Sequence, residues 1–246
     1  MENTMFVALS RQVTVRRQMD VVANNIANMN TTGFKGEKMM FVEHLVRSKG
    51  DGGVLGDKLS YVRDIATMRD TTKGHIKQTG NPLDLAIADD GYFAIEGRNG
   101  EQYTRNGRFQ MDATGQLVTE SGDPVMSSSG QPFFFGPTDT KITISGDGTV
   151  STENGPLGRL KVVKFESELS LKQAGGVLFN ASPDNPPQEV DFPNVMQGAL
   201  ESSNVQPIIE LTRMIEVQRS YDSARSFIDK EDERQKKMIR EMTKST

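Results

Sequence analysis

The sequence contains no cysteine and only two histidines, His44 and His75, among its 246 residues. Without cysteine there is no disulfide and no thiolate metal site. The two histidines stand far apart, without the clustered partners that zinc or a catalytic base requires. Nucleophile-elbow, Walker A and dinucleotide-binding motifs are missing too. We therefore predict that the protein is not an enzyme and has no catalytic, cofactor-binding or metal-binding residues.

Long hydrophobic runs and an excess of one charge are absent as well. No stretch of about 20 apolar residues occurs, so no direct membrane insertion is expected. The N-terminal residues show neither a basic first region nor a long apolar core, so we expect no cleavable signal peptide. The net charge is only -4, with 29 basic and 33 acidic residues. This balance gives no electrostatic footprint for nucleic acid, and no motif indicates a small-molecule substrate.

Glycine and proline are missing from residues 5–29, where apolar residues recur at steps of three and four. This first seam consists of Met5, Ala8, Val15, Met19, Val22, Ile26 and Met29, with Gln12 in the one polar slot. Such spacing predicts a helix that pairs along a narrow apolar face. Asparagines crowd its end, and Gly33 is expected to stop it in the left-handed conformation.

A second segment without glycine or proline follows Pro207, which is tolerated in the first turn of a helix. Residues 202–204 offer a helix cap. The second seam consists of Met214, Val217, Tyr221, Ala224 and Ile228, and another apolar stripe beside it consists of Ile208, Leu211 and Ile215. A helix from 208 to 242 would be about 50 Å long. That length favours a coiled coil over packing on a compact core.

The residues between these segments are predicted to form β-structure. Leu83, Leu85 and Ile87 alternate with other residues, as in a strand with one buried face. Turn signals separate the short apolar runs, and they lie at 99–100, 113–115, 122–124 and 146–148. Asp84, Asp89 and Asp90 lack the spacing of a Ca²⁺ loop, so we expect solvated turn carboxylates.

The expected fold class is α+β, with long N- and C-terminal helices that pair as a coiled coil and a central all-β domain of hairpins. The expected divisions are an N-terminal helical assembly segment at 1–46, a flexible connector at 47–74, a central β-rich domain at 75–197 and a C-terminal helical assembly segment at 198–246. Glycine and charged residues motivate the connector. The narrow seams bury little area, so we expect the ends to become ordered mainly on assembly.

Four stretches carry a family resemblance: ANNIANMNTTGFK at 23–35, TGNPLDLAI with GYF at 79–93, YTRNGRF at 103–109 and GALESSNV at 198–205. The chain resembles the flagellar rod, hook and hook-associated axial proteins over nearly its whole length. Its size, its N-terminal sequence and its charged tail after Ile228 are most similar to proximal-rod members of that family. A distal-rod or hook-family axial subunit is the alternative within the family.

The resemblance implies a self-assembling structural subunit of the proximal rod, the drive shaft that transmits motor torque in the flagellar basal body. Its implied partners are proximal and distal rod subunits, copies of itself and the flagellar type III export apparatus. The implied location is the periplasmic rod, reached without a cleaved signal peptide. A surface adhesin built on the β domain is a second class, but it leaves the two seams unexplained. A hydrolase lacks the residues it needs.

The expected assembly interface combines seam and stripe residues with the end of the first helix. It consists of Met5, Val15, Met19, Val22, Asn24, Asn25, Ile26, Asn28, Phe34, Ile208, Leu211, Met214, Ile215, Val217, Tyr221 and Ile228. The asparagine amides are expected to meet neighbouring backbones, although an ordinary asparagine-rich helix end is the alternative. Phe34 is expected to be a packing anchor, or else to fill a local core.

Overall fold

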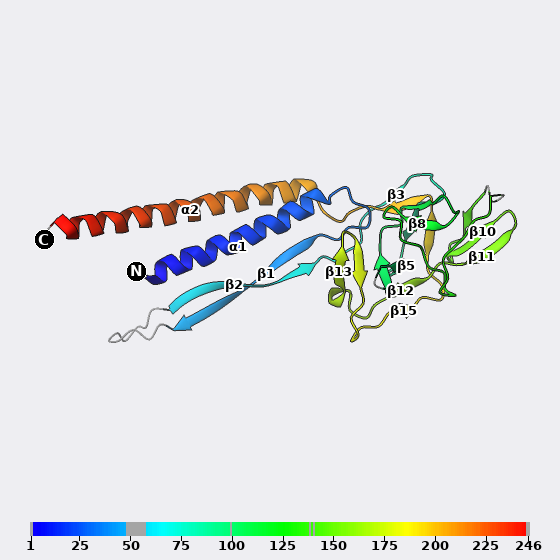
Figure 1. Ribbon diagram of the computed structural model, residues 1–246, viewed down its shortest axis with the longest axis horizontal. Helices are drawn as coiled ribbons and strands as arrows, with labels where there is room; N and C mark the ends of the chain where they lie inside the picture. Colours follow the sequence, from blue (N-terminus) through cyan, green and yellow to red (C-terminus); the bar gives the residue numbers. More distant parts are fainter. Residues whose placement is uncertain (1, 48–57, 99, 138, 140, 245–246) are drawn as a thin grey trace. The chain divides into compact units, whose positions relative to one another are not determined.

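The computed structural model describes the chain except residues 1, 48–57, 99, 138, 140 and 245–246 (Figure 1). Two compact units emerge. The helix–hairpin unit contains residues 1–27, 37–69 and 206–246, and the β unit contains residues 28–36 and 70–205. The predicted α+β class is confirmed, because a helix lies near each end of the chain and β-structure lies between them.

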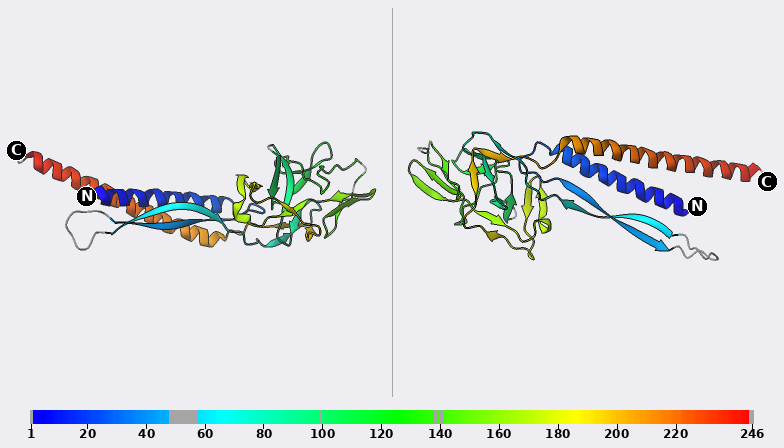
Figure 2. Two further views of the ribbon diagram at one scale, coloured as in Figure 1. Left: turned by 90° about the horizontal axis from the view of Figure 1, so that it is seen from below. Right: turned by 180° about the vertical axis from the view of Figure 1, so that it is seen from behind.

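The helix–hairpin unit is built from α1 (Glu2–Ala27), β1 (Glu37–Arg47), β2 (Lys58–Arg69) and α2 (Pro207–Lys244). The two helices pack side by side and run in opposite directions (Figures 1 and 2). The hairpin of β1 and β2 packs against α1. Among the described residues, no helix combines the length and the apolar character that crossing a bilayer requires.

Both helices begin and end close to their sequence signals. α2 starts at Pro207, as predicted, with Glu210 in its first turn. α1 ends at Ala27, where Asn28 and its neighbours take over the backbone hydrogen bonds. Gly33 has a φ of 68°, but it lies six residues beyond that end. The prediction that Gly33 stops the helix was therefore wrong, and its left-handed backbone instead lies against the backbone of Arg105 and Asn106.

A long antiparallel hairpin lies where a flexible connector was expected. β1 and β2 pair from Glu37 opposite Arg69 to Arg47 opposite Lys58, with one irregularity between Met40 and Phe41. Strand-forming residues such as Val42 and Tyr61 favour this pairing. The glycines and charges that motivated the connector are concentrated at residues 48–57, which lie outside the described residues.

The β unit consists of antiparallel strands and one short 3₁₀ helix at Glu168–Ser170. Its largest sheet has the order β13 (Lys172–Gly175), β14 (Leu178–Asn180), β6 (Gly100–Thr104), β5 (Tyr92–Gly97), β12 (Val162–Lys164), β15 (Gln188–Glu189). A three-stranded sheet joins β11 (Gly155–Arg159), β10 (Thr149–Thr152) and β9 (Thr143–Ile144). Three two-stranded sheets pair β16 (Val195–Gln197) with β4 (Leu85–Ile87), β17 (Ala199–Glu201) with β3 (Ile76–Gln78), and β7 (Phe109–Met111) with β8 (Leu117–Thr119).

The core of the β unit lies on both faces of β5. Phe93 and Ile95 point into one hydrophobic cluster, whereas Tyr92 and Ala94 join a second one. Alternate residues of a strand point to opposite faces, so a strand buried on both sides loses the polar alternation. Burial raises the pKa of Tyr103, which packs in the second cluster, to about 12.

The strand predictions hold in outline. β5 and β6 form the expected hairpin, with Phe93 opposite Thr104 and Gly97 opposite Gly100; Asn99 lies outside the described residues. Positive φ values at the glycines of the predicted turns, 115, 122 and 148, confirm those turns. The expectation for β4 was wrong, because Leu85, Ala86 and Ile87 are all buried and the strand has no solvent face.

The boundaries of the units differ from the expected divisions. Residues 28–36 and 198–205 were assigned to the two helical segments, but both belong to the β unit. Strand β17 pairs with β3, and the amide of Gly33 donates a hydrogen bond to the Glu201 carbonyl at 2.8 Å. The residues that follow α1 and the residues that precede α2 therefore both belong to the β unit.

Candidate assembly surfaces

The seams of the two terminal helices are covered largely by the chain itself. On α1, Val15 and Val22 are buried, and Met5, Met19 and Ile26 are half-buried. On α2, Val217 is buried, and Met214, Tyr221 and Ile228 are half-buried. The seam residues that were expected in an assembly interface thus lie where the helix–hairpin unit packs together.

The stripe beside the second seam is open to solvent. Ile208 is 80% exposed, and Leu211 and Ile215 are 51% and 52% exposed. Three residues of α1 that the sequence reasoning left out behave in the same way: Phe6, Leu9 and Val13 are 62%, 51% and 48% exposed. Their spacing of three and four residues indicates a shared helix face. The prediction of an interface used only the longer seam on the same helix.

Asn25 joins three elements of the helix–hairpin unit and is only 2% exposed. Its Nδ2 donates to the Glu37 carbonyl at 2.8 Å and to Glu210 Oε2 at 3.2 Å. Its Oδ1 accepts a hydrogen bond from the Glu37 amide at 2.9 Å. Arg213 holds the other oxygen of Glu210 at 2.5 Å. Asn25 therefore links α1, β1 and α2 within one chain.

The other residues expected at the end of the first helix have local environments. Asn28 is half-buried, and its Oδ1 accepts a hydrogen bond from Thr31 Oγ1 at 3.2 Å. Asn24 is exposed. Phe34 is 4% exposed, and its carbonyl accepts from the Asn204 amide. The structure thus brings Phe34 together with the C-terminal motif rather than with the seams.

Asn25→Ala is expected to lower the free energy of unfolding of the helix–hairpin unit by about 2–3 kcal/mol, because it leaves the Glu37 backbone and Glu210 without this partner. Chemical denaturation followed by the helical circular dichroism signal measures the change. Asn24→Ala, at the exposed neighbouring position, is the matched control and should stay within about 0.5 kcal/mol of the parent. Equal losses for both variants would contradict the role of Asn25.

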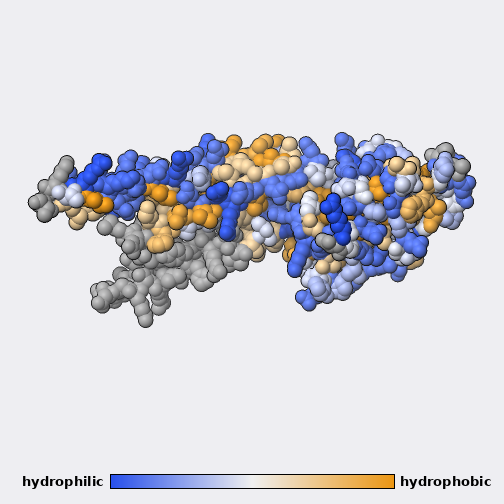
Figure 3. Space-filling model, in the orientation of Figure 1, coloured by the Kyte–Doolittle hydropathy of each residue, from blue (hydrophilic) through white to orange (hydrophobic). Residues whose placement is uncertain are grey.

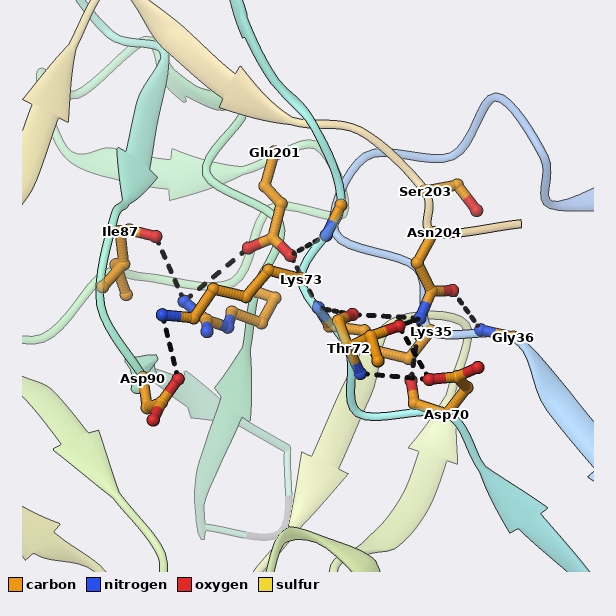
Figure 4. A network of polar contacts seen from close by, with 12 residues as sticks. Lys35, Gly36, Asp70, Thr72, Lys73, Ile87, Asp90, Glu201, Ser203 and Asn204 are labelled. Atoms are coloured by element: carbon orange, nitrogen blue, oxygen red, sulfur yellow. Dashed lines mark hydrogen bonds and ion pairs between the residues drawn. The ribbon is translucent and has the colours of Figure 1, made fainter. Parts of the chain in front are cut away.

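A buried charge network lies where the family-like motifs meet in the β unit (Figure 4). Lys35 Nζ contacts Glu201 Oε1 at 2.6 Å, and Arg105 Nη1 lies 3.6 Å from Glu201 Oε2. All three side chains are at most 3% exposed. Burial lowers the pKa of Lys35, and the Glu201 carboxylate acts in the opposite direction.

Neighbouring backbone groups satisfy most of this network, and among the described residues Arg105 Nε is left without a hydrogen-bond partner. Lys35 Nζ also donates to the Thr72 carbonyl at 2.8 Å, and the Gly74 amide donates to Glu201 Oε1 at 2.9 Å. Arg105 Nη1 donates to the carbonyls of Ile87 and Asp89 at 3.3 and 2.9 Å. Buried charges persist in proteins when they are paired and hydrogen-bonded in this way. The network therefore ties residues 35, 105 and 201 into one rigid junction.

Asn204 completes the junction on its C-terminal side. Its Oδ1 accepts from the Gly36 amide at 2.8 Å, and its Nδ2 donates to the carbonyls of Asp70 and Thr72 at 2.8 and 3.0 Å. The Asp70 amide in turn donates to the Gly36 carbonyl at 2.7 Å. A single side-chain amide thus links residues 36, 70 and 72, and with residue 204 itself it lies next to three of the four places where the chain passes between the units.

The acidic residues of the second motif do not all have the expected solvated environment. Asp84 is buried, and it accepts hydrogen bonds from Thr79 Oγ1 at 2.6 Å and Asn81 Nδ2 at 3.0 Å. Asp90 is exposed, and its ion pair with Lys73 lowers its pKa. In the part of the chain that the structure describes, no three His, Asp or Glu side chains are placed to hold a metal ion.

Known families match along most of the chain. Residues 86–152 match the family described as "Flagellar hook protein FlgE/F/G D1 domain". Residues 196–241 match "Flagellar basal body rod FlgEFG protein C-terminal", and residues 5–35 match "Flagella basal body rod protein". The matched segments include most of α1, most of α2 and central strands of the β unit.

Individual relatives agree with the families. The flagellar basal-body rod protein FlgF of Caulobacter vibrioides is 40% identical over 230 residues, which are 93% of each chain. FlgF of Salmonella typhimurium is 32% identical over 95% of each chain. FlgG of Agrobacterium fabrum, also a flagellar basal-body rod protein, is 35% identical over 87% of this chain and 90% of its own.

The relatives that match this chain are rod proteins of the flagellar basal body, and the matches cover both its helices and its β unit. The chain belongs to the flagellar basal-body rod protein family.

Proposed function

We propose that this protein is a self-assembling subunit of the proximal rod, where it transmits motor torque together with other rod subunits and copies of itself. The observation that carries the proposal is the pair of exposed apolar stripes on the terminal helices of a chain in the rod family. Exposed apolar faces of this size on paired helices favour contacts with further chains. The rigid junction of Lys35, Glu201 and Asn204 provides a stiff path for torque within the β unit.

One comparison between two relatives supports the proposed proximal position. The relative named FlgF in Caulobacter vibrioides shares 40% of its residues with this chain, whereas the relative named FlgG in Agrobacterium fabrum shares 35%. The resemblance of the sequence implies that proteins of the FlgF type belong to the proximal rod and those of the FlgG type to the distal rod. The charged tail after Ile228 supports the same choice.

We propose further that the antiparallel α1 and α2 pair as a coiled coil through the two seams. The buried Val15, Val22 and Val217 support that pairing, since knobs of this kind recur at steps of three and four. The flagellar type III export apparatus would deliver the chain to the periplasmic rod with its N-terminal residues retained. The seams then hold the subunit together, and the stripes remain for its neighbours.

Ile215→Asp tests the function in cells that carry only the variant gene. Ile215 is half exposed, so a carboxylate there leaves the isolated fold intact but places a charge in any apolar contact between subunits. The expected result is loss of swimming and of complete rods in purified basal bodies, with an unchanged thermal melt. Ser223→Asp, at an exposed polar site of the same helix, should swim normally. Normal swimming of Ile215→Asp would sink the proposal.

A further inference from the structure

A polar hollow opens on the β unit next to the charge junction, and Glu201 belongs to both. The hollow has a volume of about 220 Å³ and is lined by residues 29, 30, 32, 77, 79, 108 and 200–203. All of these residues belong to the β unit. Figure 3 shows mainly hydrophilic surface over that unit. A concave site with converging polar side chains is the usual place for a small ligand.

The charges that line the hollow favour cations. Lys77 belongs to β3, and Arg108 directly precedes β7. The acidic side chain in the lining is that of Glu201, and its carboxylate is directed into the junction (Figure 4), where it contacts Lys35 and Arg105. No other acidic residue is found among the described residues that line the hollow. The hollow therefore offers two cationic side chains to a ligand, whereas its one carboxylate is already paired.

Hydroxyl groups add hydrogen-bond donors to these charges. Ser202 and Ser203 both line the hollow. Ser203 Oγ accepts a hydrogen bond from the Val205 amide at 3.2 Å, so its own proton remains available to a ligand. Thr79 differs, because its Oγ1 already donates to Asp84 Oδ2 at 2.6 Å. The donors of the serines and the cations of the lining suit an acceptor with negative charge.

We propose that this hollow binds a small ligand through a carboxylate group. The guanidinium of Arg108 presents N–H groups in the fork that matches a carboxylate, and Lys77 adds a second positive charge. Two neighbouring carboxylates favour a ligand with a single negative charge: Asp84 lies behind Thr79, and Glu120 pairs with one nitrogen of Arg108 at 3.4 Å. A doubly charged phosphate would meet more repulsion from both.

The size of the hollow limits the ligand to a short acid. A volume of about 220 Å³ corresponds to about seven water molecules at about 30 Å³ each. Pockets for drug-sized molecules are larger, at about 300–1,000 Å³. A free small acid and the end of an acidic side chain on another protein both fit this description, and they share the carboxylate that the lining recognises.

Nuclear magnetic resonance of the isotope-labelled full chain tests the site. Sodium acetate is titrated in exchange for sodium chloride at constant ionic strength. The amide signals of Ser202 and Ser203 should shift and saturate with a Kd on the order of 1 mM, as expected for a ligand of so few atoms. Lys77→Gln and Arg108→Gln should each weaken binding about tenfold, because each removes one charged partner. Lys172→Gln removes an exposed cation that does not line the hollow, and it should leave the Kd unchanged.

A second probe, glutamate with both backbone ends blocked, distinguishes the two sources of the carboxylate. Binding at least as tight as that of acetate indicates an acidic side chain of another protein. Binding of acetate alone indicates a free small acid.

Three results would overturn the site. Acetate might shift the serine signals no more than chloride does, or bind equally well to Lys77→Gln, Arg108→Gln and the parent. Phosphate in its doubly charged form might bind more tightly than acetate, which would exclude the carboxylate class. Because the isolated chain is titrated, the result is independent of rod assembly and of the swimming test of Ile215→Asp.

Discussion

Glu201→Gln is expected to lower the free energy of unfolding of the β unit by about 3–5 kcal/mol, the usual cost of removing one partner from a buried ion network. Lys35 and Arg105 both contact the Glu201 carboxylate, and all three side chains are at most 3% exposed. The amide that replaces the carboxylate keeps the shape but leaves two buried cations without a counter-charge. Denaturation followed by the near-ultraviolet circular dichroism of buried Tyr92 and Tyr103 measures the loss.

Glu120→Gln is the matched control, because Glu120 pairs with Arg108 at 3.4 Å with both side chains about half exposed. Removing that surface pair should change stability by at most about 1 kcal/mol. A loss for Glu201→Gln no larger than that of Glu120→Gln would show that the junction contributes no electrostatic stabilisation.

The pH dependence of the Glu201→Gln variant has a definite sign. Burial already lowers the pKa of Lys35, and removal of the carboxylate that opposes this effect lowers it further. Between that lowered pKa and the ordinary lysine value, the unfolded chain binds more protons than the folded one, so stability rises with pH. The deficit of the variant relative to the parent should therefore narrow as the pH becomes alkaline.

The sequence predicts the helices of this protein better than its surfaces. Spacing alone identifies Val15, Val22 and Val217 as buried positions, because a periodic apolar face must find a partner. It does not say whether that partner is the same chain or another one. Val217 and Ile215 lie two residues apart on one helix and were both assigned to the assembly interface, yet the structure buries one and exposes the other.

The buried charge junction could not be predicted from local sequence patterns, for a different reason. Lys35, Arg105 and Glu201 are separated by long stretches of sequence, and each is an ordinary charged residue in its own segment. The resemblance of their segments to one family places all three in motifs, but contacts between distant segments bring them together: β17 pairs with β3, and the Gly33 amide donates to the Glu201 carbonyl. The same limit applies to Asp84, whose neighbours suggest a solvated turn while the strands around it exclude water.

Gly33→Ala is expected to lower the free energy of unfolding of the β unit by about 2–5 kcal/mol, through steric overlap and backbone strain together. A methyl group at Gly33 would lie 2.5 Å from the Arg105 carbonyl carbon and 2.5 Å from the Asn106 amide nitrogen. Both atoms belong to backbone that cannot rotate away as a side chain would. The positive φ of 68° adds the cost that any residue with a Cβ meets in the left-handed region.

Gly80→Ala separates the two causes, because Gly80 has a similar φ of 78° but no atom within 4 Å of an added methyl group. Its loss should be about 1 kcal/mol, from the backbone conformation alone. The difference between the two losses in free energy of unfolding then measures the effect of the close approach of residues 33 and 105. The sequence did not predict this approach, because Gly33 was interpreted as a helix stop. Because Gly33 lies two residues before Lys35 of the charge junction, Gly33→Ala should also reduce swimming, whereas Gly80→Ala should not. Equal stability losses for the two variants would show that close packing is not the reason why glycine occupies position 33.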